Sequence, residues 1–403
     1  MKEKTVKIGI IGTGGRGIFC FGVLLSKAQN VKIAALCDVN KVRMEEATKR
    51  LTGKQNLYEN TSDMFNNENL DAVIVTTPDY LHEEHAVAAL ENGVNVLIDK
   101  PLATSVKGSK EILRAAEKAG KTVMLGFNLR HDPTLKRLKQ IITDGALGNV
   151  FLIENREFYD GGKTYMSRWN RKREWSGGLW IHKGSHDFDV FQWLLDFPKP
   201  VKVSSTAGIN VLNREGIPFE LEKGIEVGPT CHECAYNKIC PDVNIYNSDE
   251  HPEWGEDARK IDNYAVDLCM YISDKDVHDN GIAIVDYDNG VRASHMECFV
   301  CSISDRMYTV VGDKGLAEVS LRNRIITVRP RWSQEVITYN IPDVAGGHGG
   351  ADPQLVKAFL NVIRGNHGNT STAEHGMWST AVGEAAEISA RENRMVWIEE
   401  LMK

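Results

Sequence analysis

The chain has 403 residues, a net charge of −7 and an apolar fraction of 42%. A chain of this length exceeds one ordinary compact core, so we expect two domains. The acidic balance disfavours nucleic acid and anionic membranes as partners, and no apolar run is long enough to cross a bilayer. Eight cysteines in a chain of this size are typical of a reducing compartment rather than a disulfide scaffold. We therefore expect a cytoplasmic protein without a secretory signal peptide.

The first chemical signal is a glycine cluster that follows a short apolar run at residues 6–11. It fits the pattern GxGxxG, which gives a tight turn, close approach of a diphosphate and close packing of the following helix. The residues expected to contact the cofactor here are Gly12, Thr13, Gly14, Gly15, Arg16 and Gly17. Asp38 ends the next apolar run, about 20 residues further on, where an acid binds the adenosine ribose. This acid favours NAD, whereas Arg16 and Arg43 leave NADP open because a guanidinium could hold a 2′-phosphate.

Strand and helix patterns alternate through the first part of the chain. Strands are expected at 31–37, 71–76, 94–98 and 122–127, and helices at 18–28, 41–51, 61–66, 82–92 and 105–119. This rhythm predicts a doubly wound parallel sheet over residues 1–127. Ligands bind beyond the carboxyl ends of such strands. The residues at these ends are Gly12, Asp38, Thr77, Lys100 and Asn128.

Longer strand-like runs begin near residue 149 and indicate a second α/β domain over 128–403 with a largely antiparallel sheet. Strands are expected at 149–158, 201–211, 282–288, 291–300, 307–312 and 334–339, and helices at 184–196, 353–363 and 373–391. Cys298 and Cys301 lie three apart on one expected strand, so their thiols should point to opposite faces. An irregular insertion occupies about 213–270, which is too long for an ordinary loop.

Two groups of residues could carry proton chemistry. Lys100 follows a strand directly and is fixed in direction by Pro101; it could bind a substrate hydroxyl or move a proton, or be a solvated loop lysine. His182 and His186 are four apart and would share a helix face. Histidine can take a hydroxyl proton near neutral pH. Asp189 could orient His186, cap the helix or form a buried ion pair.

These motifs resemble the glucose-fructose oxidoreductase / inositol dehydrogenase / rhizopine catabolism (Gfo/Idh/MocA) family along essentially the whole chain. The family's glycine loop, acidic residue, TPxxxH turn, EKP motif and D-x-x-x-H motif fall on 12–17, Asp38, Thr77-Pro78 with His82, Asp99-Lys100-Pro101 and 182–186. The resemblance implies an N-terminal Rossmann domain and Lys100 and His186 as the catalytic pair. Asp99 replaces the usual glutamate, and His182 stands where many members have aspartate. Lys183 adds a third cationic group, as in a subgroup whose substrates we expect to be sugars or glycosides.

Substrate contacts are expected near the second set of motifs and on the loop from 159 to 175. The candidates are Asn128, Arg130, Tyr159, Arg168, Trp169 and Lys183. Arginine forks bind carboxylates and aromatic faces stack on sugar rings, so an anionic sugar such as a uronate is attractive. A solvated basic loop explains the same residues equally well.

The insertion contains a cysteine pattern typical of a metal site. Cys231 and Cys234 have CxxC spacing, Cys240 follows closely, and Cys269 would complete four ligands. We expect structural zinc, with an iron–sulfur cluster as the alternative and free buried cysteines as the structural explanation. A metal would supply the ordering that this segment lacks.

The sequence thus predicts an NAD(P)-dependent oxidoreductase that oxidises a secondary hydroxyl of a sugar, sugar acid or glycoside. Two alternatives stay open. One is an NAD-dependent glycoside hydrolase or lyase that uses transient oxidation and elimination, and the other is a non-catalytic NAD-binding sensor. The resemblance further implies a homodimer or homotetramer.

Overall fold

The computed structural model describes residues 4–366 and 370–403, which form two compact units. The first unit comprises the chain up to residue 127 together with 245–266 and 352–377. The second unit comprises 128–244, 267–351 and 378–403. Two segments that lie far along the chain therefore belong to the N-terminal unit.

The first unit is built on a six-stranded sheet of order β3-β2-β1-β4-β5-β6 in which every neighbouring pair is parallel. The predicted doubly wound sheet is thereby confirmed. Its strands are β1 (Val6–Ile11), β2 (Val31–Cys37), β3 (Asn56–Tyr58), β4 (Ala72–Val75), β5 (Asn95–Ile98) and β6 (Val123–Leu125). Its helices are η1 (Arg16–Gly22), α1 (Val23–Ser26), α2 (Lys41–Arg50), α3 (Thr61–Asn67), η2 (Asp79–Leu81), α4 (His82–Glu91) and α5 (Val106–Ala119). The helix expected over 18–28 is a π-helical stretch, η1, followed by the short α1.

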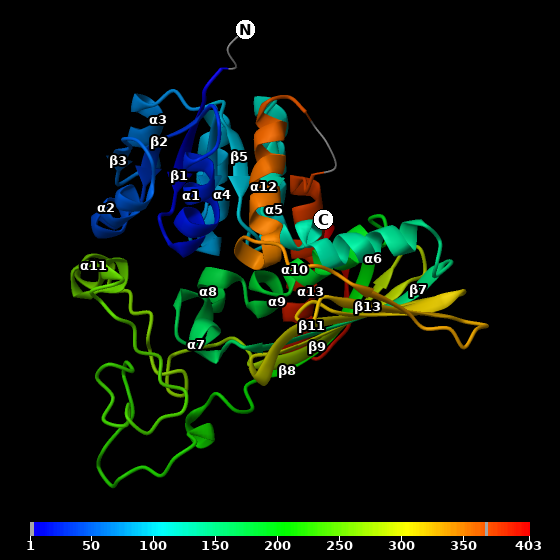
Figure 1. Ribbon diagram of the computed structural model, residues 1–403. Coiled ribbons are helices and arrows are strands. Elements are labelled where there is room, and N and C mark those ends of the chain that lie inside the picture. Colours follow the sequence, from blue (N-terminus) through cyan, green and yellow to red (C-terminus); the bar gives the residue numbers. More distant parts are fainter. Residues whose placement is uncertain (1–3, 367–369) are drawn as a thin grey trace. The chain divides into compact units, whose positions relative to one another are not determined.

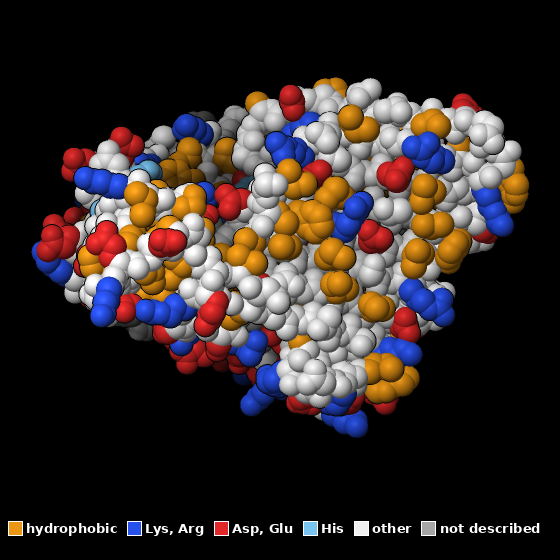
Figure 2. All heavy atoms as spheres, turned by 90° about the horizontal axis from the view of Figure 1, so that it is seen from below, with side chains coloured by type: hydrophobic (Ala, Val, Ile, Leu, Met, Phe, Trp, Pro, Cys, Tyr) orange, Lys and Arg blue, Asp and Glu red, His pale blue; other side chains and the backbone are white. Residues whose placement is uncertain are grey.

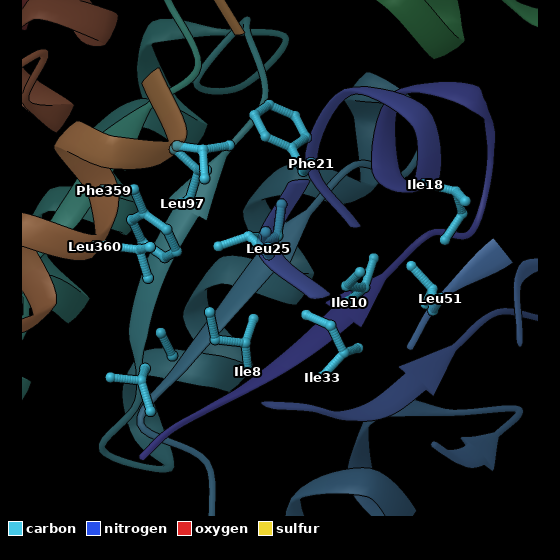
Figure 3. Packing of buried hydrophobic residues seen from close by; sticks show 14 of the residues in the cluster. Ile8, Ile10, Ile18, Phe21, Leu25, Ile33, Leu51, Leu97, Phe359 and Leu360 are labelled. Atoms are coloured by element: carbon cyan, nitrogen blue, oxygen red, sulfur yellow. The ribbon is translucent and has the colours of Figure 1, made fainter. Parts of the chain in front are cut away.

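Residues from both ends of the chain build one face of this core. Ile8 and Ile10 of β1 pack with Phe21 and Leu25, and the same cluster includes Phe359 from the distant helix α12 (Gly347–Ile363) (Figure 3). All five side chains are almost fully buried. A helix from the C-terminal part of the chain therefore contributes to the hydrophobic core of the sheet that the first 125 residues form.

The second half of the insertion also belongs to the first unit. It contains η6 (Pro252–Trp254) and α11 (Glu256–Asp262), and α11 packs beside α2 (Figure 1). The first half of the insertion, in the second unit, has only the single turn η5 (Arg214–Gly216). The insertion is thus mostly irregular chain, and its short helix α11 belongs to the first unit.

The second unit contains a nine-stranded sheet of order β14-β13-β12-β11-β7-β10-β9-β8-β15. Every neighbouring pair is antiparallel except β7 with β10, which confirms the predicted largely antiparallel sheet. Its strands are β7 (Val150–Asp160), β8 (Pro200–Gly208), β9 (Asn280–Tyr287), β10 (Arg292–Cys298), β11 (Val300–Gly312), β12 (Gly315–Ser320), β13 (Ile325–Pro330), β14 (Ile337–Asn340) and β15 (Val396–Trp397). Its helices are η3 (Asn128–His131), α6 (Pro133–Thr143), α7 (Gly162–Tyr165), η4 (Trp169–Arg171), α8 (Arg173–Ser176), α9 (Leu179–His182), α10 (Ser185–Leu194), most of α13 (Ala373–Glu392), and α14 (Ile398–Met402).

The strand expected over 291–300 is wrong at its C-terminal end. β10 ends at Cys298, and β11 begins at Val300 and pairs with the opposite edge of β7. Burial and the neighbouring Cys298 side chain raise the pKa of the Cys301 thiol to about 11, so the two side chains interact instead of pointing to opposite faces. The sequence analysis also missed β12 and β13.

The two faces of the nine-stranded sheet differ in burial. In β9, Ala283 and Val285 are buried whereas Ile282 and Ile284 are exposed. Trp180 of α9 and Phe188 of α10 pack against His295 on the covered face. Figure 2, which looks onto the underside of Figure 1, shows hydrophobic side chains gathered among charged ones. None of the helices formed by described residues is long and apolar enough to cross a membrane.

Candidate active site

The glycine turn after β1 is shaped to receive a diphosphate. Gly12 has φ +91°, and a Cβ atom there would lie 2.7 Å from the Thr76 backbone. A Cβ at Gly17 would lie 2.3 Å from the Gly12 carbonyl oxygen, so both positions require glycine. A Cβ at Gly14 would meet nothing within 4 Å. The turn is therefore tight where the chain packs and open at the residue where the phosphates are expected to approach.

Asp38 lies at the end of β2 and is fixed by the glycine turn. Its carboxylate accepts hydrogen bonds from the Thr13 backbone N–H at 2.7 Å and the Thr13 hydroxyl at 2.9 Å. The other oxygen accepts from the Asn40 backbone N–H at 2.9 Å. The acid that should bind the ribose is thus oriented by residues on both sides of it.

Arg43, the candidate for a 2′-phosphate, is engaged by the insertion. Its guanidinium pairs with Asp262 of α11, donates to the Glu253 carbonyl at 3.3 Å, and lies 5.4 Å from the centre of the Tyr264 ring. Asn40 also donates to Asp262, at 3.0 Å. The insertion therefore supplies a carboxylate that neutralises Arg43.

The strand end that carries Lys100 is rich in charge. Arg16 of the glycine turn donates two hydrogen bonds to Asp99, at 2.8 and 2.7 Å. Burial opposes ionisation of Asp99, but the Arg16 charge and its hydrogen bonds outweigh burial and lower the pKa to about 2. Lys100 itself is half-buried. Arg16 thus links the glycine turn to the DKP segment rather than standing free for a phosphate.

Thr77, Pro78 and His82 form the next turn, after β4. His82 is buried, with Nδ1 2.7 Å from the Pro101 carbonyl oxygen and Nε2 3.0 Å from the Thr77 carbonyl oxygen. The imidazole therefore ties this turn to the loop that follows Lys100. Its position is that of a residue that holds two cofactor-facing loops together.

Asp79 is a charged residue of this site that the sequence analysis missed. It is buried, and burial raises the pKa of its carboxyl to about 7, against the opposing effects of His82 and Lys100. Asp79 interacts electrostatically with Lys100, so an acidic group lies near the lysine. The sequence signal that could have identified Asp79 is its position directly after Thr77-Pro78.

In the second unit, the two histidines are the accessible side chains of an otherwise buried segment. From Leu179 to Leu194 every residue is buried except His182 and His186, which are half-buried. His182 Nε2 lies 3.2 Å from Asn170 Nδ2, and the Tyr165 and Trp169 rings flank the imidazole at 5.8 and 5.3 Å. His186 lies in the first turn of α10. The fold therefore presents two imidazoles and hides the remainder of the segment.

Lys183, between the histidines, is held in a buried ion-pair network. Its ammonium lies 2.9 Å from Glu157 of β7, and Arg306 of β11 lies 2.6 Å from the other oxygen of that carboxylate. Arg306 also pairs with Asp187 at 3.1 Å, and Tyr308 donates to Asp187 at 2.7 Å. Burial opposes the charge of Lys183, but Glu157 outweighs it and raises the pKa above the ordinary lysine value. Lys183 is thus a permanent cation.

The partners of Lys183 were not predicted from the sequence. Glu157, Arg306 and Tyr308 come from strands far from the histidine motif in sequence. The one sequence signal that could have indicated them is that charged residues recur on β7 and β11, where alternate positions of a strand are buried. The Lys183 ammonium also lies 4.7 Å from the centre of the Tyr159 ring, so that predicted substrate residue is brought to the same place.

The remaining predicted substrate residues lie in different settings. Asn128 is buried at the start of η3. Arg130 is buried and donates to Asp189 at 2.8 Å, which is the ion-pair alternative for that aspartate rather than support of His186. Arg168 is half-buried just before η4, where Trp169 packs on His182. Arg171 pairs with Asp274 at 2.7 Å and Arg173 with Glu387 at 3.1 Å.

The four cysteines of the insertion are all free and half-buried in the second unit. Burial raises the pKa of the Cys231 thiol to about 11, with contributions from Cys240 and Cys269, and Cys234 and Cys269 act on Cys240 in the same direction. The sulfurs are therefore near enough to interact. Among described residues, however, no three of these sulfurs come within 4.8 Å of one another, so a shared ion requires their side chains to turn inward.

Replacing Asp99 with Asn should reduce the free energy of unfolding by about 2 kcal/mol at pH 7, because the folded state holds this carboxylate charged beside Arg16. A lowered pKa gives stability that is present above about pH 4 and lost toward pH 2. Urea unfolding at several pH values should therefore show the variant and the wild type converging as the pH falls. Glu117→Gln, on an exposed position of α5, is the matched control, and a pH-independent difference would contradict the ion-pair account.

Comparison with known proteins agrees with this geometry. Residues 6–127 match a family model described as an oxidoreductase family with an NAD-binding Rossmann fold, and residues 139–399 match its C-terminal alpha/beta domain. YteT of Bacillus subtilis (strain 168) is 27% identical over 399 residues, covering 92% of each chain. Inositol 2-dehydrogenase of Salmonella typhimurium is 26% identical over 297 residues, which is 66% of this chain and 84% of that enzyme.

Among solved structures, levoglucosan dehydrogenase in complex with NADH and levoglucosan has a TM-score of 0.74 at 17% identity, covering 98% of this chain and 99% of that one. At this identity the likeness concerns the fold. The two family models together match nearly the whole chain. The chain therefore belongs to the Gfo/Idh/MocA family of NAD-binding oxidoreductases.

Proposed function

We propose that the protein is an NAD-dependent dehydrogenase that oxidises a secondary hydroxyl of a sugar or polyol to a ketone. The observation that carries the proposal is the pair of accessible imidazoles, His182 and His186, beside the permanent cation Lys183. The nicotinamide takes up hydride when it is bound. The relatives named above act on inositol and levoglucosan, which are both rich in secondary hydroxyls, and this supports the substrate class.

The proposed reaction converts R₂CH–OH and NAD⁺ to R₂C=O, NADH and a proton. His186 accepts the hydroxyl proton at an imidazole nitrogen, while Lys100 donates a hydrogen bond to the same oxygen and steadies its developing negative charge. His182, whose imidazole is positioned by its contact with Asn170, assists His186 in handling the proton. Asp79 and Asp99 act through Lys100 and are positioning residues.

Lys183 has a different role from a base in this proposal. Because Glu157 keeps its ammonium charged, Lys183 donates hydrogen bonds and attracts an oxygen of the substrate but does not remove a proton. Tyr159 lies against the ammonium and offers an aromatic face to the sugar ring. This division leaves His186 as the group that accepts the proton.

We favour a neutral sugar or polyol over a uronate. Two arginines of the loop from 168 to 173, Arg171 and Arg173, are already paired with Asp274 and Glu387. Arg130 is likewise paired with Asp189. With these charges balanced, a substrate carboxylate gains less from the loop than its composition suggested.

We also propose that NAD is the cofactor rather than NADP. Asp38 accepts hydrogen bonds in the position of the ribose acid, and its charge repels a 2′-phosphate. Arg43, which could otherwise bind that phosphate, is neutralised by Asp262 of α11. The insertion thereby adds to cofactor specificity.

The proposed proton acceptor is tested with the variants His186→Asn and Lys100→Met. Each should lower kcat by at least about 100-fold, whereas Lys107→Met, on an exposed position of α5, should not. The purified protein and NAD are mixed with a panel of polyols, sugars, uronates and aryl glycosides while absorbance at 340 nm and product mass are followed together.

Formation of NADH with a ketone product supports the dehydrogenase. Glycoside cleavage without net NADH would assign the elimination route instead. NAD binding without turnover of any compound, unchanged in both variants, would assign a sensor. Each outcome therefore separates the three hypotheses.

Cofactor choice is tested by Asp262→Ala, which leaves Arg43 without its carboxylate partner. We expect kcat/KM with NADP to rise about tenfold relative to the wild type, because the freed guanidinium can pair with the 2′-phosphate. Asp257→Ala removes an exposed carboxylate from the same helix and serves as the control. A wild type that prefers NADP, or an Asp262→Ala variant with unchanged NADP use, would contradict the assignment.

We further propose that the outer face of the nine-stranded sheet pairs with a second copy of the chain, giving a homodimer or homotetramer. Ile282 and Ile284 of β9 and Trp397 of β15 are exposed, and hydrophobic side chains gather on the surface in Figure 2. Exposed apolar side chains gathered on one face of a sheet are typical of an interaction surface.

Ile284→Glu should weaken this association, because it places a charge in the proposed interface. Light scattering coupled to size-exclusion chromatography should show a lower molar mass for the variant than for the wild type. Leu57→Glu, at an exposed position of β3 in the other unit, is the control. A monomeric wild type at micromolar concentration would contradict the proposal.

A further inference from the structure

The first half of the insertion is a segment that the proposed chemistry does not use. Between 213 and 244 the chain has one 3₁₀ turn as its regular structure, and several apolar side chains are exposed. They are Leu221, Ile225, Ile239 and Val243. So little burial cannot offset the conformational entropy lost when such a segment adopts a single conformation. Short segments of this kind are usually stabilised by disulfides or metals.

The backbone brings the two distant parts of the cysteine set together. Thr230 and Leu268 form an isolated antiparallel bridge. Beside it, the Cys231 N–H donates to the Asp267 carbonyl at 2.8 Å, and the Cys269 N–H donates to the Pro229 carbonyl at 2.8 Å. Cys231 and Cys269 therefore lie diagonally across this bridge, each one residue away from a bridge partner.

A compact turn joins the other two cysteines, and Cys234 and Cys269 both lie beside Gly228. The Asn237 N–H donates to the Cys234 carbonyl at 3.2 Å, and the Cys240 N–H donates to the Tyr236 carbonyl at 3.0 Å. Tyr236 is buried and its hydroxyl donates to the Ile225 carbonyl at 3.2 Å. The chain thus turns back on itself between Cys234 and Cys240.

Backbone amides surround the sulfurs in a way that suits thiolates. The Gly228 N–H donates to Cys234 Sγ at 3.3 Å, and the Asn244 N–H donates to Cys231 Sγ at 3.4 Å. A backbone N–H of Asp242 is directed at Cys240. N–H donors stabilise negative charge on sulfur and orient it, as outer-shell groups do around metal ligands.

We propose that Cys231, Cys234, Cys240 and Cys269 bind one zinc ion as four thiolates. The four sulfurs lose their protons on binding, and their side chains turn toward one another to close around the ion. The bridge between Thr230 and Leu268 already joins the segments that carry Cys231 and Cys269. Four sulfur ligands without a water position make a structural site rather than a catalytic one. The ion supplies the stabilisation that the exposed apolar segment does not provide.

The proposed site also closes the chain that carries α11. Cys240 precedes α11 and Cys269 follows it, so an ion shared by both fixes the two ends of that stretch. The helix at its centre neutralises Arg43 through Asp262. Fixing the ends lowers the entropic cost of keeping α11 on α2, so zinc should increase NAD affinity without touching the cofactor.

Metal content of the full-length protein tests the proposal independently of any activity. After purification under reducing conditions and removal of free metal, elemental analysis should find about one zinc per chain. Cys240→Ser and Cys269→Ser should each lose most of this zinc, whereas Cys301→Ser, which removes a half-buried thiol outside the set, should retain it. Protein stripped by a thiol-reactive agent and a chelator should be cut faster by protease between 241 and 268, and added Zn²⁺ should restore protection.

Three outcomes would overturn the proposal. The first is wild-type protein that retains less than about a tenth of a zinc per chain even after incubation with Zn²⁺ under reducing conditions. The second is iron with inorganic sulfide at the same cysteines, which would assign a cluster instead of zinc. The third is equal zinc loss in Cys301→Ser and Cys240→Ser, because the metal would then not depend on this set. NAD titration of metal-loaded and stripped protein separately tests the effect on α11.

Discussion

The architecture of the cofactor side depends on the close approach of two glycines. Gly17 lies so near the carbonyl of Gly12 that a Cβ would be 2.3 Å from the oxygen, and a Cβ at Gly12 would be 2.7 Å from the backbone of Thr76, just after β4. This contact sets where the chain leaves β1 and where the following helix starts. Asp38 follows β2, which pairs with β1, whereas Asp99 and Lys100 follow β5, which is separated from β1 by β4. The hydrogen bonds from Thr13 to Asp38 and from Arg16 to Asp99 complete the same arrangement.

In the second unit, one carboxylate organises the charge around Lys183. Glu157 lies between the cations Lys183 and Arg306, and Asp187 balances the second of these. Removing any one member would leave a buried charge without its partner, which is costly in a protein interior. The network keeps Lys183 charged. In the proposed reaction Lys183 therefore donates hydrogen bonds, and the imidazole of His186 accepts the proton.

Local patterns predicted the fold because its signals are local. Alternating strands and helices, the glycine turn and the motif order were enough for the parallel sheet, and the longer strand-like runs after residue 149 were enough for the antiparallel one. What could not be predicted depends on pairings between distant residues. Glu157 and Arg306 meet Lys183 from other strands, Asp189 pairs with Arg130, and Asp262 reaches Arg43 across more than half the chain. No local pattern specifies such partners, since each is selected by burial of charge in the folded state.

Isotope transfer is the direct test of the proposed hydride transfer from a substrate carbon to NAD. The compound that responds in the substrate panel is prepared with deuterium on its carbinol carbons and incubated with the protein and NAD, and the mass of the reduced cofactor is measured. We predict one deuterium in each reduced nicotinamide and a ketone product that has lost it. Reduced cofactor without deuterium, or product formed with no reduced cofactor at all, would contradict the account.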